Sequence, residues 1–274
     1  MTRKQQTGLV AALFCLFPLL IILFIPVGLL QETIQRVMAD QGYSITADRF
    51  GKAFPLGLTA QKVTIADTRG PLLRFDSFSL RPAFFPLLTG RAALSARAVI
   101  GTGTINVLWE SGSRGGISAD LDRISLEQIP FFVTATGAAV QGTLRGEVRL
   151  SGPPLRMNGT VKLEARNASC SDLKIGEMPL PAVRNETLKG MIRVKDGRGR
   201  VESLTLDGGG VYARLHGDIP LAASAPLDLT LELMPTAETL EKQKFIFLLL
   251  VKYLVSPGYY RLPVQGTPAR PQLL

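Results

Sequence analysis

The chain has few of the side chains on which catalysis and metal binding depend. Its 274 residues include one histidine and two cysteines. His216 lies between Leu215 and Gly217 on the charged face of an expected strand, a setting that does not indicate a catalytic triad. Cys15 lies in a long apolar run and Cys170 far along the chain, so we expect no disulfide between them. The composition therefore predicts no enzymatic activity, no metal site and no cofactor.

Phosphate-binding loops are also missing from the sequence. Gly101–Thr104 and Gly208–Gly210 are interpreted as turns or bulges between strands, because no helix follows them to supply its N-terminus. Asp120 and Asp122 are interpreted as a solvated pair on one strand face. The net charge is +9, and one expected hairpin carries a cluster of basic residues: Arg193, Lys195, Arg198, Arg200 and Arg214. A solvated sheet face explains this cluster. Anionic lipid headgroups or an acidic partner are the alternatives, and nucleic acid is not an expected partner.

A long apolar run near the N-terminus predicts a membrane anchor. Residues Gly8 to Leu30 form 23 positions without a charged side chain, which as a helix would extend about 34 Å and cross a bilayer. Arg3 and Lys4 precede the run and place the N-terminus in the cytoplasm. The alternative is a cleaved signal peptide, although this core is longer than usual. The residues expected to anchor the chain are Leu9, Leu13, Phe17, Leu20, Ile22, Phe24 and Leu29.

The chain is therefore expected to have four parts. Residues 1–7 are a cytoplasmic stub, residues 8–30 a transmembrane helix and residues 31–42 a juxtamembrane amphipathic helix. Residues 43–274 form a β-rich domain outside the membrane, which in a bacterial host would be periplasmic, with the anchor in the inner membrane.

From about Leu58 the dominant pattern has period two, which predicts strands. Apolar and polar residues alternate without error in Thr143–Leu150, Thr160–Arg166, Val211–His216 and Leu227–Leu233. Turn sequences such as Asn158-Gly159 and Asp196-Gly197 separate such runs. One face of each strand is charged and crossover helices are missing, so we expect an antiparallel meander with one apolar face. Earlier strands alternate less cleanly, which indicates bulges or burial on both faces.

One C-terminal amphipathic helix interrupts this mainly β pattern. The helix is expected from about Thr236 to Val255, and its core, Phe245–Val251, is entirely apolar. We expect it to cover the apolar face or the end of the sheet; the alternative is a helix lying against a membrane. The apolar linkers Pro82–Leu88 and Pro130–Val133 are expected to be buried loops, with lipid contact as the alternative.

The order of these elements resembles the AsmA-like proteins, and most closely the type II secretion system protein N (GspN) family. The similarity covers nearly the whole chain and rests on three groups of segments. They are Phe50–Leu58 with Val63–Ile65 and Leu72–Asp76; Leu87–Arg91 with Ile100–Ile105; and Leu215–Ile219 with Leu227–Leu231 and Tyr260–Pro271.

The resemblance implies two functions. The GspN family implies an accessory or scaffold component of a type II secretion system, with inner-membrane subunits of that system as partners and no catalytic residues. The wider AsmA-like resemblance implies a curved sheet whose apolar face shelters lipid acyl chains, so that the chain would bind or transfer lipid. The candidate groove residues for that second function are Val148, Leu163, Val194, Leu215 and Leu229. An ordinary packed core explains the same residues equally well.

Overall fold

The computed structural model of the chain describes residues 27–40, 42–53, 57–83, 92–112, 115–153, 156–175, 177–208, 210–220, 226–267 and 270–273. The expected stub and most of the expected membrane span lie outside these residues. Within them, no helix combines the length and the apolar character needed to cross a bilayer. The first described element is helix α2, Val27–Asp40. It covers most of the expected amphipathic segment and packs against the first two strands, β1 (Ser44–Thr46) and β2 (Arg49–Ala53).

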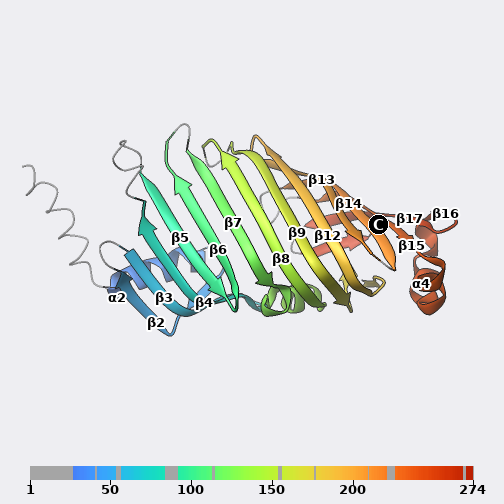
Figure 1. Ribbon diagram of the computed structural model, residues 1–274, viewed down its shortest axis with the longest axis horizontal. Helices are drawn as coiled ribbons and strands as arrows, with labels where there is room; N and C mark the ends of the chain where they lie inside the picture. Colours follow the sequence, from blue (N-terminus) through green and yellow to red (C-terminus); the bar gives the residue numbers. More distant parts are fainter. Residues whose placement is uncertain are drawn as a thin grey trace, which may run out of the picture.

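The fold is mainly β, as the alternating pattern predicts. One antiparallel sheet of sixteen strands holds almost the whole chain, in the order β1-β3-β4-β5-β6-β7-β8-β9-β12-β13-β14-β15-β17-β16, with β2 also on β3 and β18 also on β17. Figure 1 shows the strands side by side along the long axis, from α2 at one end to α4 at the other. Neighbours in the sheet are neighbours in the chain with three exceptions: β2 comes between β1 and β3, a small hairpin between β9 and β12, and β16 between β15 and β17. The predicted antiparallel meander is therefore confirmed.

The remaining strands have the following bounds: β3 Gly57–Asp67, β4 Gly70–Pro82, β5 Ala93–Ile100, β6 Gly103–Glu110, β7 Gly116–Ser125, β8 Ala139–Ser151, β9 Asn158–Ser171, β12 Val183–Lys195, β13 Arg198–Asp207, β14 Val211–Pro220, β15 Asp228–Pro235, β16 Leu254–Ser256, β17 Tyr259–Thr267 and β18 Arg270–Leu273. A separate hairpin of β10 (Lys174–Ile175) and β11 (Met178–Pro179) lies between β9 and β12.

Bulges explain why the alternating pattern is imperfect in some strands. The register of β7 on β8 shifts between Leu121 and Ile124, and Arg123 at that point has a φ of +50°. A second left-handed residue, Asn167 with φ +52°, separates Ala165 from Ala168 in β9. In each case the extra residue brings a buried side chain back to the same face after three positions instead of two, since Ile124, Ala165 and Ala168 are all buried.

The expected C-terminal helix is divided into short segments. They are α4 (Ala237–Lys242), α5 (Lys244–Leu249) and the 3-10 turn η3 (Val251–Tyr253). The break occurs at Gln243, whose side-chain amide makes two hydrogen bonds with the backbone of Ala182. Gln243 Oε1 accepts from the Ala182 N–H at 2.9 Å, and Nε2 donates to the Ala182 carbonyl at 3.0 Å. The prediction of one continuous helix is therefore wrong, because a contact from outside the helix fixes Gln243 in a non-helical conformation.

The sheet curves around one of its faces, and two connecting segments show this. The β10–β11 hairpin follows β9 yet contacts β18, although five strands separate β9 from β18 in the sheet. The turns η1 (Leu126–Gln128) and η2 (Phe132–Thr136) follow β7. From η2, Thr134 Oγ1 donates a hydrogen bond to the Pro71 carbonyl of β4 at 2.7 Å. Both segments close the same concave side.

The two apolar linkers have different outcomes. Most of Pro82–Leu88 lies outside the described residues. Pro130–Val133 leads into η2, which begins at Phe132; Phe131 is 41% exposed and Val133 64% exposed. Only Phe132 packs inward, against a small cluster around Leu126. The expectation that this linker is a buried loop is therefore wrong for two of its apolar side chains, because a helical turn directs them outward.

Candidate functional site: the apolar face of the sheet

Four parallel rows of apolar residues cross the sheet on its concave side, which we call the apolar face. The register of the strands connects each row from residue to residue. The first row crosses twelve strands, from β3 to β17, and consists of Ala60, Phe78, Ala98, Ile105, Leu121, Gly146, Leu163, Gly190, Leu204, Leu215, Leu231 and Leu262. At about 4.8 Å between neighbouring strands, eleven spacings give a length of about 53 Å along the sheet.

The second row crosses the same twelve strands two residues away. It consists of Leu58, Leu80, Ala96, Val107, Ala119, Val148, Val161, Ile192, Val201, Gly217, Leu229 and Val264. Two shorter rows flank this pair, one from Ile124 to Tyr260 and one from Leu94 to Ile219. Because no charged residue occurs in the four rows, the face is continuously apolar.

The five candidate groove residues all lie on this face, but their surroundings differ. Val148, Leu163 and Leu215 are half-buried. Val194 and Leu229 are buried, with 5% and 8% of their surface exposed. The structure thus brings the five residues onto one surface, where Val148 and Leu163 are accessible, Leu215 packs against the buried C-terminal cluster, and Val194 and Leu229 are buried.

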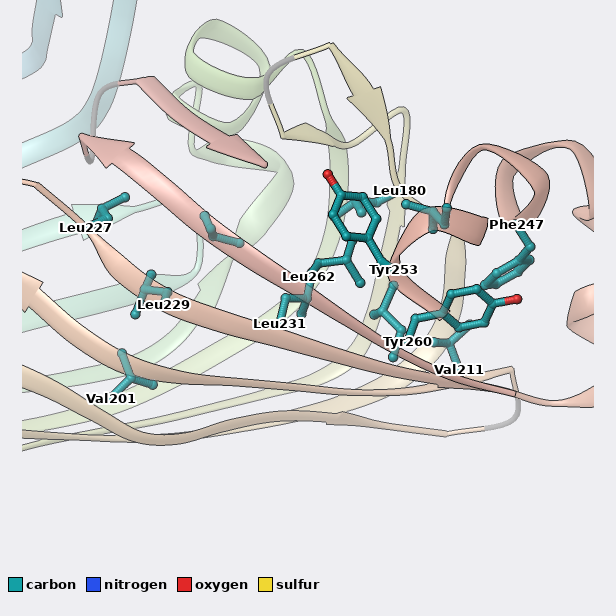
Figure 2. Packing of buried hydrophobic residues seen from close by; sticks show 13 residues of the cluster. Leu180, Val201, Val211, Leu227, Leu229, Leu231, Phe247, Tyr253, Tyr260 and Leu262 are labelled. Carbon is teal, nitrogen blue, oxygen red and sulfur yellow. The ribbon is translucent and has the colours of Figure 1, made fainter. Parts of the chain in front are cut away.

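The C-terminal end of the apolar face is a sealed core. Leu229, Leu231 and Leu233 of β15 pack with Leu262 of β17, which is fully buried. Figure 2 shows side chains of α5 and η3 on the same cluster, with the ring of Phe247 beside that of Tyr260. Their centroids are 5.4 Å apart. Leu180, which follows β11, is buried in the cluster, and Ile175 and Met178 of the β10–β11 hairpin pack against it. Protein therefore covers the face from about β14 to β18.

The middle of the apolar face is less covered. In the first row, every residue from Ile105 to Leu215 is half-buried, whereas the ends of the row at Ala60 and Leu262 are buried. Two glycines in this stretch allow neighbouring leucines to lie flat on the sheet. A Cβ on Gly146 would be 3.0 Å from Leu163 Cδ2, and a Cβ on Gly190 would be 2.6 Å from Leu204 Cδ1. The result is a low apolar surface that remains partly open to solvent.

The opposite face of the same strands is charged and faces water. Asp120 pairs with Arg149 at 2.8 Å, and Asp122 with Arg145 at 3.2 Å, so each of these aspartates has a basic partner. Other exposed ion pairs continue across the strands: Glu147–Lys162, Glu164–Arg166, Arg193–Glu202 and Arg200–Asp218. Each such pair contributes little to stability, but together they keep this face hydrated. The two faces of the sheet therefore differ sharply in polarity.

The residues considered for chemistry lie apart from one another. His216 is on the charged face with its Nε2 3.7 Å from Glu232 Oε1, and Tyr259 donates a hydrogen bond to the same carboxylate at 2.8 Å. Cys170 is half-buried in β9. No group of three or more metal-ligating side chains occurs in the part of the chain that the structure describes.

Two features of the site have weak signals in the sequence. The buried carboxylate of Glu186 lies at the margin of the apolar face, paired with Ala168 across β9 and β12. The leucines over Gly146 and Gly190 are set by pairing between strands that lie far apart in the chain. Of the expected anchor residues, Leu29 belongs to α2, and Leu9, Leu13, Phe17, Leu20, Ile22 and Phe24 lie outside the described residues.

The chain matches no protein-family model, no curated protein and no solved structure. A function is therefore inferred from the geometry of the apolar face.

Proposed function

We propose that this chain is a lipid-binding protein that holds acyl chains on the apolar face of its sheet. The observation that carries the proposal is the pair of uninterrupted apolar rows across twelve strands, of which the first is half-buried at every position from Ile105 to Leu215. A core that served packing alone would be covered along its whole length, as the C-terminal end is. Acyl chains would cover the remaining surface, and each methylene group removed from water contributes about 0.8 kcal/mol.

The continuity of the rows also supports movement of a bound lipid along the sheet. A polar or charged side chain in a row would lose hydration whenever an acyl chain passed over it. The rows from β3 to β17 contain only apolar residues and glycine, so such a barrier does not arise there. Transfer of lipid along the long axis is therefore part of the proposal, and the charged opposite face keeps the outer side of the carrier in water.

The scaffold role in a type II secretion system remains a prediction, together with the inner-membrane location. The sheet edges support it. Among the described strands, β1 and β2 pair only with β3, and β16 and β18 pair only with β17. Edge strands expose backbone groups that a partner strand can pair with. A scaffold that also carries lipid would satisfy both proposals.

Photo-crosslinking in cells tests the lipid proposal with two adjacent positions. A photoreactive amino acid replaces Leu163, on the apolar face, or Lys162, on the charged face, in the full chain. We expect phospholipid to become attached at position 163 and not at position 162. The same comparison at half-buried Val148 and its neighbour Glu147 repeats the test on another strand.

Two results would overturn the proposal. Equal lipid attachment at both positions would mean contact without face selectivity. Attachment of a protein at position 163 in place of lipid would mean that a partner covers the apolar face, which would favour the scaffold role.

A further inference from the structure

Large apolar side chains are exposed together at the C-terminal end of the molecule. Phe245 is 72% exposed, Leu248 66%, Leu249 39% and Val251 56%. We call these four residues the α5 patch. Phe245, Leu248 and Val251 line one hollow of about 710 Å³, so they form a continuous surface. Single exposed apolar residues are ordinary in proteins, but a contiguous group marks a site of interaction.

The segment that carries the patch is firmly attached to the sheet. The residues between the exposed ones point into the sealed core: Phe247 is 4% exposed, Leu250 is fully buried and Tyr253 is 7% exposed. The Gln243 hydrogen bonds to Ala182 hold the start of α5. The segment therefore holds its exposed side chains in a fixed position, because its other side chains are buried in the core.

The patch is also continuous with the apolar face. Tyr260 ends the third row of that face, beside Leu233, and it lines the same hollow as Phe245. The aromatic contact between Phe247 and Tyr260 joins the two surfaces (Figure 2). An acyl chain entering the hollow would thus meet the end of a row without crossing a charged residue of β15 or β17.

Lysines lie at the margin of the patch. Lys244 lines the hollow, and Lys252 directly follows Val251 of the patch, with its Nζ 4.6 Å from the centroid of the Tyr253 ring. Glu241 also lines the hollow, while Glu238 on α4 is paired with Lys242. Apolar side chains with lysines beside them suit the boundary between acyl chains and anionic headgroups, where the lysine stem is buried and its ammonium group reaches the headgroups.

We propose that the α5 patch docks the C-terminal end of the sheet onto the surface of an anionic phospholipid bilayer. This end is opposite α2 along the long axis (Figure 1). Docking would leave the open middle of the apolar face between a membrane at this end and α2 at the other. This inference concerns a surface separate from the open face and does not require that face to bind lipid.

Vesicle flotation tests the docking. The full chain is reconstituted into phosphatidylcholine nanodiscs, which accommodate its apolar N-terminal segment, and is mixed with protein-free vesicles of phosphatidylethanolamine and phosphatidylglycerol at about 3:1. The double variant Phe245→Glu with Leu248→Glu is expected to bind vesicles about tenfold more weakly, or more weakly still, because the charged glutamate side chains cannot enter the acyl region as the apolar side chains do. The control, Phe131→Glu with Val133→Glu at the start of η2, replaces two other exposed apolar side chains and should bind as the unmodified chain does.

Further experiments distinguish the possible binding partners of the patch. Lys244→Ala with Lys252→Ala should weaken binding to vesicles that contain phosphatidylglycerol and leave the weaker binding to pure phosphatidylcholine vesicles unchanged. Unaltered flotation of the Phe245→Glu, Leu248→Glu variant would overturn the proposal, as would an equal loss in the η2 control. Self-association of the nanodiscs that this variant abolishes, with flotation unchanged, would assign the patch to a second copy of the chain and also overturn it. Circular dichroism of each variant confirms that the fold is retained.

Discussion

The buried carboxyl of Glu186 accepts a hydrogen bond from the backbone N–H of Gly210, with 3.3 Å between Oε1 and the nitrogen. The residue is 1% exposed, and its other oxygen, Oε2, has no hydrogen-bond partner among the described residues. Burial raises the pKa of this carboxyl above its ordinary value of 4.5, and the nearby charge of Asp207 acts in the same direction. A buried acid is therefore held at the margin of an apolar surface by backbone donors at Gly210 and Val211, and one of its oxygens has no partner among the described residues.

Replacing this acid with its amide should stabilise the chain at neutral pH. Because the folded pKa lies above the unfolded pKa, the cost of the buried charge is absent below about pH 4.5 and complete above the raised folded pKa. We expect Glu186→Gln to raise the melting temperature at pH 7.5, with the gain shrinking toward zero near pH 4. Thermal scans at a series of pH values measure this.

Glu164 provides the control for that pH dependence. Its pKa is lowered, chiefly by the hydrogen bond from Arg166, so its small contribution to stability is present above the unfolded pKa and is lost on acidification. Glu164→Gln should leave the melting temperature at pH 7.5 unchanged or slightly lower. A stabilising effect of the same size in both variants would contradict a special role for the burial of Glu186.

Glycines on the apolar face should differ in their tolerance of a methyl group. A Cβ on Gly159 would be 1.9 Å from the Arg149 carbonyl oxygen, and Gly159 has a φ of +155°. Backbone cannot move aside easily, so Gly159→Ala should destabilise the fold by about 3 kcal/mol or more. In Gly190→Ala the new methyl meets the mobile end of Leu204, and the expected loss is about 1 kcal/mol. Urea denaturation followed by the fluorescence of the single tryptophan, Trp109, compares them. Equal losses would contradict this distinction.

The two hydrogen bonds of Gln243 should hold α4 and α5 in place. Gln243→Ala removes both hydrogen bonds to the Ala182 backbone and should lower the unfolding free energy by about 1–2 kcal/mol. We expect faster cleavage of the α4–α5 segment under limited proteolysis. The adjacent Lys242→Ala removes only an exposed ion pair with Glu238 and should be cleaved at the unmodified rate. Faster cleavage in both variants would mean that the segment is sensitive to any substitution there.

Substitutions at two leucines of the same row should distinguish the sealed end of the apolar face from its accessible middle. Leu262 is fully buried, so Leu262→Ala should cost about 3 kcal/mol or more in unfolding free energy. Leu163 is half-buried, and Leu163→Ala should cost clearly less while reducing the amount of phospholipid that purifies with the chain. Denaturation and lipid mass spectrometry on both variants measure these effects. An equal stability loss, with lipid unchanged, would mean that the middle of the face is ordinary core.

The sequence predicts the strands well where the local pattern is regular. The alternation in Thr143–Leu150 corresponds to β8, and Asp196-Gly197, with φ of +49° and +74°, forms the turn between β12 and β13. Both signals are local, because side-chain direction and turn conformation depend on adjacent residues.

Other features require contacts between distant parts of the chain. A bulge lies between Leu121 and Ile124, and only the pairing of β7 with β8 reveals it. Gln243 interrupts a helical pattern through Ala182, sixty-one residues away. The half-burial of Leu163 depends on which segments cover the sheet, and no property of the residues near Leu163 encodes that coverage. The existence of an apolar face was therefore predictable, and the division between its open and sealed parts was not.

Because successive strands are mostly neighbours in the sheet, the length of the sheet can change by addition or loss of strands. An extra hairpin inserted between two neighbouring strands would restore the antiparallel direction, keep every row in phase and lengthen the sheet by about 9.6 Å. For an insertion on the N-terminal side of β9, neither α2 nor the α5 patch would need to change, because α2 packs against β1 and β2 and the α5 segment packs with the β10–β11 hairpin and strands that follow it. The distance between the two ends of the protein could thus evolve by duplication or loss of hairpins, independently of what either end binds.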